Sequence, residues 1–74
     1  MLLGTRISML RKAKGLSQQE LASLTGISQT YISKVEKNKR QPTIGKVILI
    51  SKALGTTIEE ILSEIDEITY KHKK

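Results

Sequence analysis

The chain has 74 residues, a formal net charge of +6 and no cysteine. This length allows one small domain near the lower limit for a self-sufficient core, and the lack of thiols excludes disulfides and thiolate metal sites. No apolar run is long enough to span a bilayer, and residues 1–6 lack the apolar segment of a signal peptide. We therefore expect a cytoplasmic protein without a membrane partner.

Positive charge is concentrated in the first three quarters of the chain. Residues 1–55 contain ten Lys or Arg and only two Glu, whereas residues 56–74 contain three Lys and five acidic residues. A basic body of this kind indicates a polyanionic partner such as nucleic acid. Charge that serves solubility alone is the alternative that the composition leaves open.

The first helix is expected over residues 3–14. Leu3, Ile7 and Leu10 fall on one face at helical spacing, and Gly15 ends the pattern. Basic residues near its end complement the negative end of the helix dipole.

Two short helices joined by a tight turn are predicted within residues 17–37. Ser17 and Glu20 have the spacing of a capping box, which starts the first of these helices at about residue 18. Gly26 can take the positive φ that ends this helix, and Ser28 is a suitable N-cap for the second. This order is typical of a helix-turn-helix unit, although a plain helical hairpin with a polar outer face has the same outline.

The second of these helices, at about residues 29–37, has two different sides. Ile32 and Val35 are expected to point inward, which leaves hydrogen-bonding side chains on the opposite side: Gln29, Thr30, Ser33 and Lys34. A polar, strongly basic loop follows, and Pro42 closes it.

A fourth helix is expected over residues 44–54, with Thr43 as its N-cap. Its expected inner face consists of Ile44, Val47, Ile50, Ala53 and Leu54.

The last helix is expected at about residues 57–70, after a second capping box formed by Thr57 and Glu60. Ile58, Ile61, Ile65 and Ile68 repeat in it at heptad spacing. A domain of this size can bury only some of them, so we expect a homodimer interface made by Ile48, Leu49, Ile61, Ile65 and Ile68. An ordinary amphipathic helix that frays toward its end is the alternative.

Beginning at Arg11, the chain carries the pattern R-x-x-x-G-L-S-Q-x-E-L-A-x-x-x-G-I-S-x-x-x-I-S-x-x-E-x-x-x-R-x-P-T. This pattern resembles the Cro and phage-repressor type of helix-turn-helix, also called the Xre family, and the resemblance covers about residues 3–62. It implies an all-α fold, a compact five-helix, lambda-repressor-like DNA-binding domain, and says little about the residues after Leu62. The chain length predicts that residues 1–74 form a single domain. Members of that family are usually dimeric transcription regulators.

The resemblance also implies roles for individual residues. It makes residues 29–37 the recognition helix and assigns base reading to Gln29, Thr30, Ser33 and Lys34. Gln suits adenine, Lys suits guanine, and Thr offers a methyl group for thymine. Backbone phosphates are expected at Gln18, Ser28, Tyr31, Lys37, Asn38, Lys39 and Arg40. Arg11 and Glu36 are expected to form a structural ion pair instead of touching DNA.

The expected function is a sequence-specific regulator of transcription that binds double-stranded DNA at a pseudo-palindromic operator as a homodimer. A small controller, a phage repressor and an antitoxin are the settings that fit. The alternative is an antitoxin-like protein-interaction module that uses the C-terminal helix. We expect no enzyme, no cofactor and no metal site, since the single His72 lies in a charged tail and no acid–base pair is evident.

Overall fold

A computed structural model describes residues 1–65, and this part of the chain contains helices and no strand. The helices are α1 (Leu3–Ala13), α2 (Gln18–Thr25), α3 (Gln29–Glu36), α4 (Ile44–Ala53) and α5 (Ile58–Leu62). Except in the last helix, the predicted boundaries agree with these to within one residue. None of the helices in this range has the length and apolar character needed to cross a membrane.

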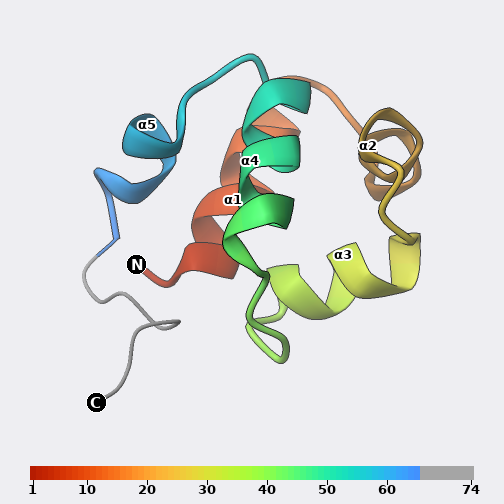
Figure 1. The fold of residues 1–74 in the computed structure, drawn as a ribbon, viewed down its shortest axis with the longest axis horizontal. Coiled ribbons are helices and arrows are strands. Elements are labelled where there is room, and N and C mark those ends of the chain that lie inside the picture. The colour runs from red at the N-terminus through yellow and green to blue at the C-terminus, as the bar shows by residue number, and fades with distance from the viewer. Residues whose placement is uncertain (66–74) are drawn as a thin grey trace.

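The helices pack around one core, with α4 near the centre of Figure 1. Helix α2 packs on α3 and α4, α1 packs on α3 and α5, and α4 also packs on α5. Helix α3 runs past the N-terminal end of α4, so that one side of α3 is left facing outward (Figure 1). The fold thus places the predicted recognition helix at the edge of the domain.

The starts of α2 and α3 form as their sequences predict. At α5 the Thr57 hydroxyl accepts from the Glu60 amide at 3.1 Å, which is one of the two bonds of the capping box predicted there. The Ser17 hydroxyl accepts a hydrogen bond from the Glu20 amide at 3.0 Å, and the Glu20 carboxylate accepts one from the Ser17 amide at 2.8 Å. Gly26 then ends α2 with a φ of 74°, a left-handed conformation that glycine adopts without strain. The Ser28 hydroxyl accepts from the Tyr31 amide at 3.1 Å and so caps α3. These local bonds fix the turn of the helix-turn-helix unit.

Apolar side chains from all five helices form the core. Its buried members are Leu3, Ile7, Leu21, Ile27, Ile32, Val35, Val47, Ile50, Leu54 and Ile61. Ile44, which was predicted to lie on the inner face of α4, is instead 53% exposed. The covered part of α4 begins one turn later, at Val47, so this prediction was wrong.

The last helix differs most from expectation. Helix α5 ends at Leu62, although a helix to about residue 70 was predicted. The Glu60 carbonyl accepts hydrogen bonds from the Ser63 hydroxyl at 2.8 Å and from Arg6 Nη2 at 3.0 Å. These side chains replace the main-chain amide that would bond this carbonyl if the helix continued.

This early end also breaks the predicted heptad seam. Ile61 is fully buried in the core and therefore cannot face a second subunit, which corrects its assignment to a dimer interface. Ile65 is partly buried against the same core. Ile68 lies outside the described residues.

Candidate nucleic-acid interface

The outer side of α3 carries the four predicted base-reading side chains together. Gln29, Thr30 and Lys34 are exposed, and Ser33 is half-buried. They line an open hollow of about 370 Å³ with two further polar residues, Gln18 and Lys37. The inward side of the same helix is held by Ile32 and Val35, each only 1% exposed. This division of α3 leaves its polar side free to meet a ligand, and base contacts by these residues remain a prediction.

A buried ion pair ties α3 to α1. The Glu36 carboxylate accepts hydrogen bonds from Arg11 Nε at 2.7 Å and from Arg11 Nη2 at 2.9 Å, so the contact is bidentate. Arg11 Nη1 also donates to the Leu16 carbonyl at 2.7 Å. The two side chains are only 9% and 5% exposed. This is the predicted structural pair, and it fixes the C-terminal end of α3.

The ion pair changes the acidity of both groups. The hydrogen bond to Glu36 raises the pKa of Arg11 above its ordinary value, although burial opposes this. Burial by itself would raise the pKa of Glu36. Hydrogen bonds from Arg11, Gln18 and Ser8, together with the positive charge of Arg11, outweigh burial and hold this pKa below its ordinary value. Glu36 is therefore ionised at neutral pH.

Gln18 connects this network to the outer hollow. The side-chain amide nitrogen of Gln18 donates to Glu36 Oε1 at 3.0 Å. Gln18 is also the first residue of α2. Main-chain amides at a helix N-terminus attract anions, which suits the phosphate contact predicted for this position. Glu36 therefore fixes the orientation of the Gln18 amide beside the hollow.

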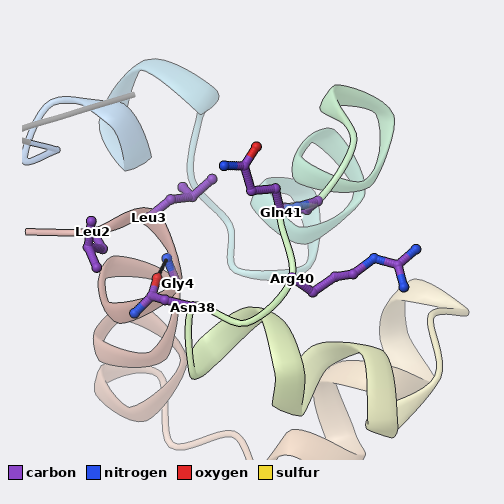
Figure 2. A pocket seen from close by; sticks show the side chains of 7 residues that line it. Leu2, Leu3, Gly4, Asn38, Arg40 and Gln41 are labelled. Carbon is purple, nitrogen blue, oxygen red and sulfur yellow. Dashed lines mark hydrogen bonds between the residues drawn. The ribbon is translucent and has the colours of Figure 1, made fainter. Parts of the chain in front are cut away.

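Asn38 makes structural contacts that the sequence pattern does not indicate. It takes a φ of 61°, a left-handed conformation that Asn tolerates better than most residues. Its Oδ1 accepts from the Gly4 amide at 2.9 Å, and its Nδ2 donates to the Thr5 hydroxyl at 3.0 Å. Figure 2 shows the Asn38 side chain turned toward the start of α1. Asn38 therefore joins the end of α3 to α1, and its predicted phosphate contact stays a prediction.

Gly4 allows this close approach. A Cβ atom at this position would come within 1.9 Å of the Val35 carbonyl oxygen and 2.6 Å of Asn38 Oδ1. Any larger residue would push the end of α3 away from α1. Nothing in the spacing of apolar residues signals this contact, since it depends on the crossing of two helices distant in sequence.

Cations surround the outer side of α3. Lys37, Lys39 and Arg40 are exposed in the loop that follows it. Tyr31, also predicted to contact phosphate, is half-buried, and its ring lies 4.7 Å from the Arg40 guanidinium carbon and 5.3 Å from Lys46 Nζ. Sequence reasoning missed Lys46, because residues 31 and 46 are brought together only by the way the chain turns back between α3 and α4.

A second surface is apolar. Ile44, Ile48 and Leu49 on the outer side of α4 are 53%, 38% and 45% exposed. Gly45 lies among them, and a Cβ atom there would meet nothing closer than Thr43 Oγ1 at 4.0 Å. This side of α4 lacks the polar cover expected for a helix that faces only water.

A fold of this kind, with a capped turn and an outward polar recognition helix, defines a helix-turn-helix protein. The model of the helix-turn-helix family matches residues 7–61. The chain belongs to this family of Cro/Xre-type transcriptional regulators, which are not enzymes.

Individual relatives agree with this assignment. Control protein C.SmaI from Serratia marcescens is 34% identical over 62 residues, which span 84% of this chain and 74% of that protein. The crystal structure of the restriction-modification controller protein C.AhdI from Aeromonas hydrophila superimposes with a TM-score of 0.78 at 36% identity, covering 80% of this chain and 89% of that one. A crystal structure of SinR, a master regulator for biofilm formation, in complex with DNA gives a TM-score of 0.78 at 34% identity, covering 82% of this chain and 98% of that one.

Proposed function

We propose that this chain is a cytoplasmic, sequence-specific regulator of transcription that binds double-stranded DNA at a pseudo-palindromic operator as a homodimer. One observation carries the proposal: α3 anchors itself with Ile32 and Val35 and presents four hydrogen-bonding side chains on its free side. An α-helix fits the major groove of B-DNA, where each base pair offers a distinct pattern of donors and acceptors.

The base-reading roles follow from side-chain chemistry. Gln29 can bond with both N6 and N7 of adenine, and Lys34 can donate to O6 and N7 of guanine. Thr30 offers a hydroxyl and a methyl group that fits the thymine methyl, and Ser33 offers a hydroxyl. The Arg11–Glu36 pair holds α3 in place before DNA binds. Binding therefore does not have to order this helix, which lowers its entropic cost.

Phosphate contacts are proposed for residues that border α3. They are Gln18, Ser28, Tyr31, Lys37, Asn38, Lys39 and Arg40. Neither α3 nor α4 has an acidic residue in its first turn, so nothing there opposes a phosphate at these two helix starts. Contacts of this kind position the protein on DNA and make binding fall with salt.

The apolar side of α4 is proposed as the dimer interface. Ile48 and Leu49 are exposed as the dimer hypothesis requires, and Ile44 extends the same surface toward the N-terminal end of the helix. Gly45 would let a second helix approach closely. Two copies related by a two-fold axis would then place their α3 helices about 34 Å apart, one turn of DNA.

Similarity to two controller proteins favours a small controller of a restriction-modification operon as the biological setting. The antitoxin-like alternative depended on an apolar seam along the last helix. Because Ile61 belongs to the core, that alternative has lost its main support within the described residues.

The decisive experiment is selection of bound fragments from random duplex DNA at about 0.15 M salt, followed by footprinting of the enriched sequence. The expected result is one pseudo-palindromic sequence whose half-sites are centred about 10 base pairs, or a multiple of that spacing, apart. A chain that enriches no duplex sequence at this ionic strength would not be a sequence-specific regulator.

A further inference from the structure

Three parts of the fold meet at the ring of Tyr31. Tyr31 is in the first turn of α3, Arg40 is in the loop between α3 and α4, and Lys46 is in the first turn of α4. The Arg40 guanidinium carbon and Lys46 Nζ lie 4.7 Å and 5.3 Å from the ring centroid. In Figure 2 the Arg40 side chain points away from Gly4 and Asn38, toward the side of the loop where α3 lies.

The Tyr31 ring is fixed in place while both cations stay accessible. Tyr31 packs against the core, so its ring has a defined position. Arg40 is exposed and Lys46 is partly exposed. A cation over an aromatic face is attracted by the ring quadrupole, which restricts two otherwise flexible side chains. The ring therefore holds two positive charges in one place at the surface.

These two charges have no carboxylate partner within residues 1–65. The ion pairs of the described chain join Arg6 to Glu60 and Arg11 to Glu36. The Thr43 hydroxyl caps α4 by accepting from the Lys46 amide at 3.3 Å, which leaves the first amides of this ten-residue helix for another acceptor. Two cations that no carboxylate of residues 1–65 compensates, beside a positive helix end, favour an anion.

We propose that Tyr31, Arg40 and Lys46 form one phosphate-binding site for the DNA backbone, in which Lys46 is a contact that the sequence pattern does not reveal. This inference rests on the proposed function and adds to it. The site adjoins Gln29 and Thr30 in the chain, so a phosphate held there borders the groove that α3 enters. It fixes the register of α3 on the duplex and carries no sequence information of its own.

The matched pair of variants Lys46→Gln and Lys52→Gln tests this site. Both remove one positive charge from α4, but Lys52 lies in the last turn of the helix, about 9 Å farther along its axis. Affinity for a duplex carrying the selected operator would be measured by fluorescence anisotropy across a series of salt concentrations. Losing one phosphate contact should make the slope of log K against log salt shallower by about 0.9, which is about an eightfold loss of affinity at 0.1 M salt.

The expected result is this loss for Lys46→Gln, on operator and random duplex alike, with a much smaller change for Lys52→Gln. Combining Lys46→Gln with Tyr31→Leu should cost less than the product of the two single losses, because the ring positions the ammonium group. Thermal unfolding of each variant checks that the fold is retained.

Equal salt slopes for the two lysine variants, with operator binding by the unaltered protein intact, would overturn this site and leave the proposed function standing. Fully multiplicative losses for Tyr31→Leu and Lys46→Gln would remove the ring from the site. If the unaltered protein bound no duplex at all, the proposed function and this site would both fail.

Discussion

Replacing Arg11 by Met should destabilise the domain more than any surface change. Methionine keeps much of the side-chain volume but deletes three hydrogen bonds, two to Glu36 and one to the Leu16 carbonyl. The Glu36 carboxylate, whose side chain is 5% exposed, would keep its charge without a cation beside it. Breaking a buried pair in this way costs about 3–5 kcal/mol.

This cost is large beside the total stability of the domain. A 74-residue chain is expected to have a free energy of unfolding of about 4–11 kcal/mol. The midpoint of thermal unfolding should therefore fall by at least about 12 °C. Urea unfolding followed by circular dichroism at neutral pH would measure the difference. A loss below about 1 kcal/mol would refute the view that this pair holds α3 in place.

The pH dependence gives the same prediction a second readout. Because the pKa of Glu36 is lowered in the folded state, its contribution to stability is present above the unfolded pKa of about 4.3 and is lost as the pH falls through the folded value. Without Arg11, burial favours the protonated carboxyl. The stability difference between the unaltered protein and Arg11→Met should therefore shrink as the solution is acidified. A difference that stays constant from neutral pH to about pH 3 would contradict the assigned protonation states.

Three further substitutions test other parts of the structure. Lys34→Ala should weaken operator binding by about 1–3 kcal/mol and relax the preference at one base pair, as measured by repeating the selection; an equal loss on every duplex would mean that Lys34 reads no base. Ile48→Asp should shift the protein from dimer to monomer in sedimentation while leaving its helical content unchanged, because that side chain is 38% exposed in a single chain. Gly4→Ala should lower the free energy of unfolding, measured with urea, by about 1–3 kcal/mol or more, because the new Cβ atom would clash with the Val35 carbonyl. An unchanged free energy of unfolding would show that α1 can shift to make room for this atom.

Local rules explain why much of the fold was predictable. The capping box of Ser17 and Glu20, the positive φ of Gly26 and the 3.6-residue spacing of core residues act within a few residues, so the sequence displays them directly. The outer face of α3 was predictable for the same reason, since fixing Ile32 and Val35 inward fixes the opposite side as well.

The missed features depend on contacts between distant segments. Ile44 has the right spacing for the inner face of α4, but no side chain of residues 1–65 covers it enough to bury it, and it stays 53% exposed. The isoleucine repeat suggested a long helix, whereas Arg6 and Ser63 donate hydrogen bonds to the Glu60 carbonyl in the last turn of α5. Asn38 and Lys46 have polar side chains whose partners, Gly4 and Tyr31, come from other helices. The periodicity of the sequence cannot predict these contacts, because they depend on how the helices cross.

The division of α3 into a buried side and an outward side has a consequence for how such a protein could diverge. Stability depends on Ile32, Val35 and Glu36, whereas the proposed function assigns target choice to the polar side chains on the opposite side of the helix. Descendants of one ancestral gene could therefore acquire different operators through a handful of codon changes while inheriting the same scaffold. Exchanging only the outward residues between two such proteins should likewise transfer DNA preference without redesigning the interior.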